Sequence, residues 1–300
     1  MVVFDKSRRA LIGLIVFLSG VTYVDGFCGH RSAVSFPSVL RPSTPTRLPF
    51  RQQKRLSPLT RKASTNDGVS QEEVDELFDG KMTLSLVGGQ AALIPLAVAA
   101  GFVLRTPNLG FGPGISFDTA ALTTGVLYVI PLGIIAVVLE FVEKYVPALQ
   151  AVSEATQRSV MALLGGTFKP GLAVLISVAL GCVAGFGEEM LFRGILQYEI
   201  AQRFGTALAL GATSVVFGLL HAVTPLYAVM ATMASVYFGY LYQMSGNLAV
   251  PIITHAVYDL GALLAAHWTV TQLTDRQRAE ILGWLDDEEE ETVENDRPTP

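Results

Sequence analysis

A small set of ionisable residues lies within an otherwise apolar stretch, and its spacing could support acid–base chemistry. Glu188 and Glu189 are adjacent, and Glu189 lies four residues before Arg193. Residues four apart share one face of a helix and can form an ion pair. Glu188 is rotated by about 100° from Glu189 on the same helix. One carboxylate can therefore be neutralised by the arginine while the other points into a cavity.

Two histidines follow at helical spacing from other residues of interest. His221 lies four residues after Phe217, and His255 lies four residues before Asp259. The carboxylate of Asp259 could therefore orient the imidazole of His255. With Glu188, the two histidines could hold and activate a water molecule, or Glu188, His221 and His255 could bind a metal ion. The cofactor is thus either zinc or none, and the residues leave both open.

Each of these residues also has a purely structural explanation. Glu189 and Arg193 could form only a helix-stabilising ion pair, and a single histidine in a membrane is more often a hydrogen-bonded core residue than a ligand. Ionisable groups at membrane depth are costly, however, and mark functional sites by default. Between Phe204 and Thr274 the only formally charged side chain is Asp259. We therefore expect a functional cluster, with Glu189 and Arg193 in a supporting role.

Apolar segments must carry these residues through a membrane. The chain of 300 residues is 51% hydrophobic and only 16% charged, whereas a soluble domain carries about 25% charged residues. A bilayer span needs about 20 apolar residues and must be helical, because lipid offers the backbone no hydrogen bonds. We predict an all-α, polytopic membrane bundle with about six spans: Thr83–Leu104, Thr119–Val142, Gly171–Phe192, Gly205–His221, Pro225–Met244 and Leu248–Trp268.

Small residues near the polar cluster favour close helix packing. Gly181 and Gly185 are four residues apart just before the glutamates, and Gly211 and Gly218 lie in the span that ends at His221. Such residues let helix backbones approach closely in membranes. The remaining histidine of the apolar region, His267, lies beside a tryptophan near the end of the last span, so we expect it at the membrane interface.

The N-terminal region has the composition of targeting segments. Residues 1–26 contain basic residues, a short apolar run and then small residues, which is typical of a cleaved signal peptide. Residues 27–66 are basic and free of acidic residues, as in transit peptides. The alternatives are a first transmembrane helix and a disordered basic linker. The order of the two segments resembles the bipartite presequence of algae with complex plastids, so we expect a plastid membrane, with the endoplasmic reticulum membrane as the alternative.

The rest of the chain divides by composition. Residues 67–82 form a polar lead-in, and residues 83–170 hold the first two spans and a connecting loop. Within that loop, Leu149–Leu164 could form either a helix on the membrane surface or a plain connecting helix. Residues 171–268 form the membrane core that carries the ionisable cluster. The acidic segment 269–300 is expected to be a disordered tail.

Three motifs in this core resemble those of a known family. Glu188-Glu189-x-x-x-Arg193, Phe217-x-x-x-His221 and His255-x-x-x-Asp259 occur in this order on successive predicted spans. Each motif alone is weak, but the ordered set is specific. It resembles the CPBP membrane-protease family, which includes type II CAAX prenyl endopeptidases and proteins similar to lysostaphin resistance protein A. The resemblance covers roughly Gly171–Trp268.

The resemblance implies an intramembrane endopeptidase, with Glu188 as the general base acting on water. His221 and His255 would bind that water, a metal ion or the oxyanion, so the enzyme could be a metalloendopeptidase. Asp259 stands where the prenyl endopeptidases usually have Asn, whereas many other members have Asp. CAAX processing is therefore one candidate activity, and a plastid location would argue against it. The alternatives are a non-proteolytic membrane chaperone or scaffold of the same fold and, with no repeated half to support it, a transporter.

The expected partners follow from this assignment. They are the lipid bilayer and a membrane protein or peptide substrate, either membrane-associated or of the prenylated type. No nucleic-acid partner is expected.

Overall fold

The computed structural model describes residues 68–78, 80–111 and 114–282, and within these ranges the chain is helical and has no strand. The expected signal peptide and transit-like segment lie outside the described residues. The elements are α2 (Gln71–Leu77), α3 (Gly80–Ala91), α4 (Leu93–Leu104), a 3₁₀-helix η1 (Pro107–Gly110), α5 (Thr119–Leu127), α6 (Val129–Glu143), α7 (Pro147–Leu164), α8 (Pro170–Glu189), a π-helix η2 (Met190–Gln197), α9 (Tyr198–Phe204), α10 (Thr206–Leu220), α11 (Pro225–Ser245), α12 (Ala249–Gln272) and α13 (Asp275–Leu282).

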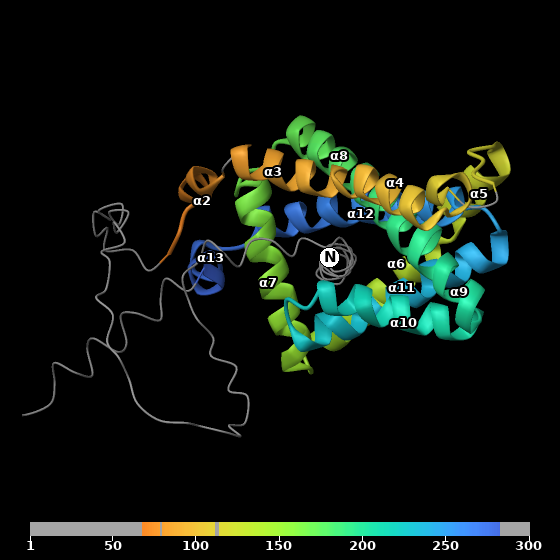
Figure 1. Ribbon diagram of the computed structural model, residues 1–300. Coiled ribbons are helices and arrows are strands. Elements are labelled where there is room, and N and C mark those ends of the chain that lie inside the picture. The colour runs from red at the N-terminus through yellow and green to blue at the C-terminus, as the bar shows by residue number, and fades with distance from the viewer. Residues whose placement is uncertain (1–67, 79, 112–113, 283–300) are drawn as a thin grey trace, which may run out of the picture.

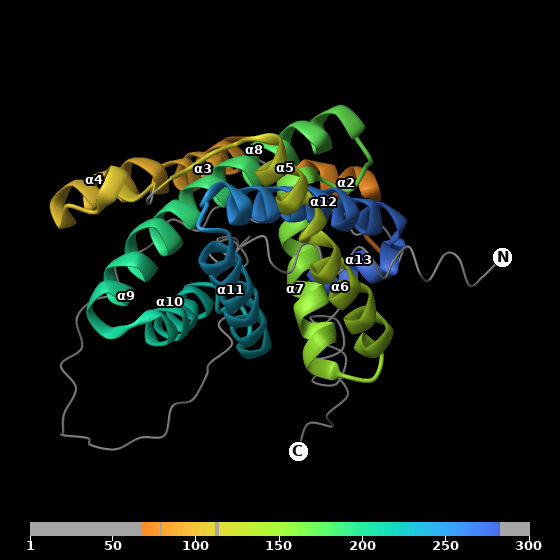
Figure 2. The same cartoon turned by 90° about the vertical axis from the view of Figure 1, so that its right-hand side faces the viewer.

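Helices α8 and α12 form the centre of the bundle (Figure 1). Helices α3 and α4 run alongside α8 and contact it, and α5 and α7 pack on α12. Helices α10 and α11 pack against each other and lie below these helices in Figure 2. Glycines allow the central contact, as expected. A Cβ atom on Gly181 would lie 2.7 Å from the carbonyl oxygen of Ala256, and one on Gly185 would lie 2.9 Å from the Ala256 nitrogen.

Four helical stretches in the described part of the chain are long and apolar enough to cross a bilayer. α10 is apolar but has only 15 residues. α11 has 21 residues but carries several tyrosine and hydroxyl side chains, and it is not among the four. The helical membrane bundle is thus confirmed, and the count of six spans stays a prediction. The four stretches are Thr83–Leu104, Thr119–Glu143, Pro170–Phe204 and Ala249–Gln272.

The third span extends beyond Phe192, where it was expected to end. α8 continues without a break through η2 and α9 to Phe204, giving a helical stretch of 35 residues. The π-helix η2 begins directly after Glu189 and contains Arg193. Single π-helical turns within α-helices are rare and frequently lie at functional sites. The charged residues at 188–193 therefore do not end the helix, because they are accommodated inside the protein.

The connecting loop forms α7, which is packed inside the protein along one face. Helix α7 contacts α12, α2, α6 and α13. The expected helix is therefore present, and its placement as a plain connecting helix or on the membrane surface stays a prediction. The side chains buried along this face are Leu149, Val152, Ser153, Thr156, Ser159, Val160, Met161, Leu163 and Leu164.

The C-terminal segment is helical farther than expected. α12 continues to Gln272 and α13 ends at Leu282, so helix replaces the disordered tail predicted for residues 269–282. The buried side chain of Arg278 donates a hydrogen bond of 2.8 Å to the carbonyl oxygen of Val69. The amide of Val69 in turn donates to the carbonyl oxygen of Asp275 at 2.9 Å. These contacts order α13 against the segment that precedes α2, and residues 283–300 lie outside the described residues.

Candidate functional site

All six predicted site residues meet inside the bundle. Glu188 and Glu189 end α8, Arg193 lies in η2, His221 follows α10 directly, and His255 and Asp259 lie one turn apart on α12. They come from three separate helical stretches, as the spacing predicted. Their relative exposures are 4% for Glu188, 0% for Glu189, 1% for Arg193, 7% for His221, 1% for His255 and 1% for Asp259.

Glu189 links the arginine to a histidine. Its Oε1 atom accepts a hydrogen bond of 2.9 Å from the Arg193 guanidinium and lies 2.9 Å from Nδ1 of His255. The second terminal nitrogen of Arg193 donates to the carbonyl oxygen and to Oγ of Ser235, each at 2.8 Å. Buried charges need such pairing to offset their desolvation. Glu189 is therefore more than a helix-stabilising partner of Arg193, because it also fixes the imidazole of His255.

Asp259 lies beside His255, as its spacing predicted, but it is not the closest carboxylate to that ring. Its Oδ2 atom lies 3.4 Å from Nε2 of His255, a longer and weaker contact than that of Glu189 with Nδ1. A carboxylate can only accept, so Nδ1 carries a hydrogen that it donates to Glu189. Glu189 thus sets the orientation of His255, and Asp259 lies beside the nitrogen that faces Glu188. Oδ1 of Asp259 has no hydrogen-bond partner among the described residues.

His221 is held by the helix end that it follows. Its Nδ1 atom lies 2.7 Å from the carbonyl oxygen of Phe217, and its ring stacks on the Phe217 ring with centroids 4.1 Å apart. Since a carbonyl oxygen only accepts, Nδ1 is the donor here and Nε2 of the neutral ring is left as an acceptor. The spacing of four residues between Phe217 and His221 therefore serves to aim Nε2 into the site.

Glu188 stands apart from direct hydrogen bonding to either histidine. Its Oε2 atom lies 3.8 Å from Nε2 of His221 and 4.0 Å from Nε2 of His255. Both distances exceed that of a hydrogen bond, and one water molecule that lies to the side of these atoms could contact all three. The arrangement can therefore hold a small polar molecule between one carboxylate and two imidazoles.

The possible zinc ligands match a metal site in type but not in spacing. Two ligands of a tetrahedral zinc ion, with bonds of about 2.0–2.1 Å, lie about 3.4 Å apart, whereas Glu188 is 3.8 and 4.0 Å from the two histidine nitrogens. In the described part of the chain no group of three or more His, Cys, Asp or Glu residues has the geometry to hold a metal ion. We therefore derive no chemical step through a metal.

Three residues of the site were not anticipated from the sequence. Ser235 binds Arg193, the ring of Phe238 stacks on His255 with centroids 4.7 Å apart, and Gln197 donates to the carbonyl oxygen of Gly239 at 3.1 Å. These contacts attach η2 and α12 to α11. A serine and an aromatic residue on a span are common in helix packing, so only the position of Gln197, one turn after Arg193, could have drawn attention.

His267 lies outside the cluster, and its position at the membrane interface stays a prediction. It is 0% exposed, and its ring stacks on that of Phe168 with centroids 5.6 Å apart. Neither ring nitrogen has a hydrogen-bond partner among the described residues. The loop before α8 covers this part of α12 through Phe168.

A comparison with protein families matches the part of the chain that carries the cluster. Residues 170–261 match the family described as type II CAAX prenyl endopeptidase Rce1-like. A stretch of 77 residues is 38% identical to the uncharacterized protein YpbD of Bacillus subtilis (strain 168). This stretch covers 25% of the chain and 36% of YpbD, so the match spans about a third of that relative's length. No solved structure matches the chain.

The family match includes all three motifs and ends two residues after Asp259. It supports protease activity of the CAAX type in general and does not define a substrate. Together with the three motifs that meet inside a helical membrane bundle, the Rce1-like domain at residues 170–261 supports a member of the CPBP membrane-protease family.

Proposed function

We propose that the protein is an intramembrane endopeptidase in which Glu188 activates a water molecule for attack on a peptide carbonyl. The observation that carries this proposal is the position of Glu188, whose Oε2 atom lies 3.8 and 4.0 Å from two histidine nitrogens without bonding to either directly. One water molecule placed between these atoms would donate one hydrogen to Glu188 and the other to His221. Its lone pairs would then face the substrate.

In the proposed step, Glu188 takes a proton from water while the water oxygen forms a bond to the carbonyl carbon. The carbonyl π electrons move to its oxygen, which becomes an oxyanion. The intermediate then collapses, the carbon–nitrogen bond breaks, and Glu188 returns the proton to the leaving nitrogen. General acid–base catalysis of this kind contributes typically 10²–10⁴-fold.

His255 is the candidate for stabilising the oxyanion. Glu189 holds its Nδ1 atom, and Nε2 faces the side of the site where Glu188 lies. When Nε2 carries a hydrogen, it can donate to the oxyanion, and a preorganised donor costs no reorganisation during the reaction. Asp259, 3.4 Å from Nε2, supports the charge on this ring. Arg193 acts at a distance, because it holds the carboxylate that orients His255.

The proposed substrates are membrane-associated peptides, including those of the prenylated type. The family match supports CAAX-type proteolysis in general, and the aspartate at 259 leaves the prenyl requirement open. The plastid membrane remains the proposed location, and zinc or no metal remains the proposed cofactor status.

The decisive experiment compares wild type with Glu188→Gln in detergent. The probes are fluorogenic peptides that end in a CAAX sequence, with and without a prenyl group. The amide keeps the size and hydrogen bonding of the side chain but cannot accept the proton, so cleavage should fall by at least ~10²-fold while the protein still folds. Equal cleavage by the two proteins would remove Glu188 from the mechanism. A second readout compares the proteomes of membranes that contain wild type or the Glu188 variant. If wild type cleaved none of the probes and no membrane protein in this comparison, the scaffold alternative would be favoured over the protease.

A chelator provides the test for metal. Activity that is lost with a chelator and restored by added zinc would show that the three ligands close around a metal ion during catalysis. Activity that is unaffected would support water activation by Glu188 alone.

A further inference from the structure

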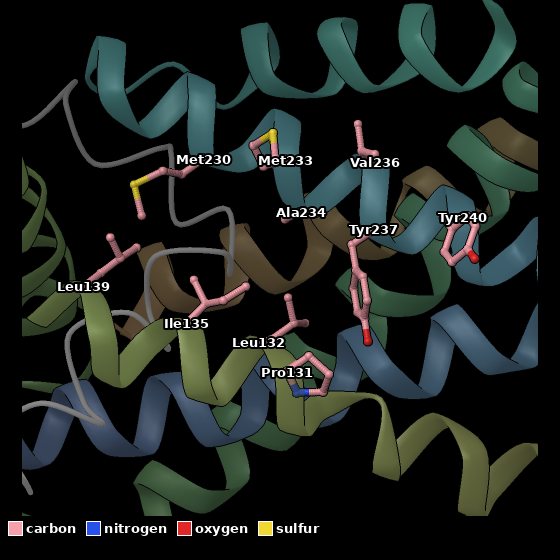
Figure 3. A pocket seen from close by; sticks show the side chains of 10 residues that line it. All are labelled: Pro131, Leu132, Ile135, Leu139, Met230, Met233, Ala234, Val236, Tyr237 and Tyr240. Atoms are coloured by element: carbon pink, nitrogen blue, oxygen red, sulfur yellow. The ribbon is translucent and has the colours of Figure 1, made fainter. Parts of the chain in front are cut away.

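Two cavities lie end to end along α5–α6 and α11, on the side of α11 away from Arg193. The larger, of about 470 Å³, lies between α6 and α11 (Figure 3). The smaller, of about 310 Å³, lies between α5 and the end of α11. Tyr237 lines the larger cavity and donates a hydrogen bond of 2.8 Å to the carbonyl oxygen of Tyr128, which lines the smaller one. The tyrosine pair therefore lies where the two cavities adjoin.

The larger cavity is lined almost entirely by apolar side chains. Figure 3 shows Leu132 and Ile135 on one wall and Met230, Met233 and Ala234 on the other. Methionine side chains are flexible and adapt to irregular apolar partners. The side chain of Met233, on α11, is 64% exposed. The cavity is therefore open to the outside of the protein along part of α11. The chemistry of this cavity suits a hydrocarbon chain.

The smaller cavity has the opposite character. It contains the carboxylate of Asp118 and the polar side chains of Thr124, Ser245 and Asn247, and no lysine, arginine or histidine lines it. Asp118 precedes the span, and hydrogen bonds from the Ala121 amide and from the Ser116 hydroxyl lower the pKa of its carboxyl group. This end of the groove therefore carries a negative charge that no basic lining residue neutralises, and it attracts cations.

We propose that the two cavities together bind one membrane lipid whose headgroup carries an ammonium group. The ammonium lies at Asp118, and one acyl chain lies between α6 and α11. A transmembrane helix fits less well, since a helix of about 10 Å diameter occupies roughly 400 Å³ per turn. The larger cavity, of about 470 Å³, would hold little more than one turn, but its size is within the range of about 300–1,000 Å³ common for small-molecule sites.

The site lies back to back with the glutamate–histidine cluster. α11 presents Ala234 and Tyr237 to the groove and Ser235 and Phe238 to the cluster, where they contact Arg193 and His255. A bound lipid therefore supports the helix that positions the cluster. The proposal concerns lipid binding and does not depend on peptide hydrolysis.

The test measures which lipid the purified full chain retains. The protein is incorporated into nanodiscs of equal parts phosphatidylethanolamine and phosphatidylglycerol, extracted in mild detergent and examined by native mass spectrometry. Wild type should retain one phosphatidylethanolamine. Met233→Trp fills the groove and should retain about tenfold less, equivalent to about 1.4 kcal/mol. Leu175→Trp is the matched control, because Leu175 is similarly exposed, at 66%, but lies on α8 outside the groove.

Asp118→Asn tests the headgroup separately from the chain. Asparagine also caps helices well and can still accept from the Ala121 amide, so α5 is preserved while the charge is lost. This variant should retain both lipids equally. Ile135→Trp, on the opposite wall, replaces Met233→Trp if the latter does not fold. The proposal is overturned if wild type retains no lipid or both lipids equally, if the tryptophan variants retain as much as wild type, or if the groove is occupied by a second copy in a lipid-free dimer.

Discussion

Two carboxylate clusters beside α12 contain similar side chains but bond them differently. Around Asp75 on α2, one oxygen accepts from the amides of Gly166 and Thr167 at 2.8 and 3.0 Å, and the other accepts from Lys169 at 2.8 Å and from the Thr167 hydroxyl. Glu188 instead lies 3.8 and 4.0 Å from its two histidines. The Asp75 carboxylate is fully hydrogen-bonded and attaches α2 to the loop before α8, whereas Glu188 makes no direct hydrogen bond to either histidine, as the proposed role in acid–base chemistry requires.

The same contrast holds for the two buried histidines of α12. Glu189 fixes one nitrogen of His255, and the other faces Glu188 and Asp259. His267, beside the loop that binds Asp75, stacks on Phe168 and has no hydrogen-bond partner for either nitrogen among the described residues. His255 thus has a carboxylate partner at 2.9 Å, whereas the close contact of His267 is the ring of Phe168.

The largest expected effect is a loss of folding stability, and it should differ between substitutions of Arg193 and Lys169. Arg193→Ala leaves Glu189 unpaired at 0% exposure, and breaking a buried pair in this way costs about 3–5 kcal/mol. Lys169→Ala breaks a pair whose lysine side chain is 46% exposed, and such pairs contribute about 1 kcal/mol or less. The measurement is membrane abundance and unfolding in detergent. Equal losses for the two variants would contradict the distinction.

The second comparison uses the two histidines. His255→Ala should lower peptide cleavage by about 10² or more, because it removes the proposed oxyanion donor. His267→Ala should leave the cleavage rate per folded molecule unchanged and lower only the stability. Both side chains are buried on the same helix, so each variant controls for the other. A comparable fall in rate for His267→Ala would show that the cluster around Asp75 takes part in catalysis.

A smaller effect is expected at Asp259. Asp259→Asn keeps an acceptor near Nε2 of His255, 3.4 Å away in the native protein, and loses only the charge. Cleavage should therefore fall by less than the ~10²-fold of a lost acid–base group, and Asp259→Ala should fall further. Rates are compared at matched protein concentration. If the cleavage rate of Asp259→Asn were as low as that of His255→Ala, the negative charge of Asp259 would itself be required.

The smallest effect concerns pH. Partial burial disfavours ionisation of Asp75, but hydrogen bonds from Lys169 and Thr167 outweigh it and lower the pKa from 3.8 to about 2. A lowered folded-state pKa stabilises the fold above the unfolded value, and this contribution is lost as pH falls through the folded one. Stability from this cluster should therefore decline between about pH 4 and pH 2. Acid unfolding in detergent measures it, and Asp75→Asn, which lacks the titrating group, should show a shallower pH dependence.

The sequence predicted the residues of the cluster better than their connections. Glu189 and Arg193 form the expected pair because it is local to one helical stretch. The contact of Glu189 with His255 joins residues 66 positions apart and depends on how α12 packs on α8, which residue types alone do not specify. Asp259 was the natural choice to orient His255 because it lies one turn away, but the side chain from the neighbouring helix is closer.

For the fold, the sequence likewise predicted the helices better than their ends and contacts. Apolar runs located the helices, since a bilayer requires backbone hydrogen bonds within each span. Their ends were less certain. α13 is ordered by Arg278 and Val69, residues more than 200 positions apart, and the span after Pro170 extends to Phe204 because η2 replaces a helix end. Neither feature has a local signal in the chain.

The π-helix makes the register of the chain matter as much as its residue types. A π-helical turn bonds residue i to i+5 and so holds one residue more than an α-helical turn. If all residues of Met190–Gln197 were instead wound as an ordinary α-helix, the extra residue would rotate everything beyond it by about 100° relative to α8. Gln197 would then turn away from Gly239, to which it now donates. The wider π-helical turn therefore accommodates one additional residue while the helix beyond it stays in position against α11.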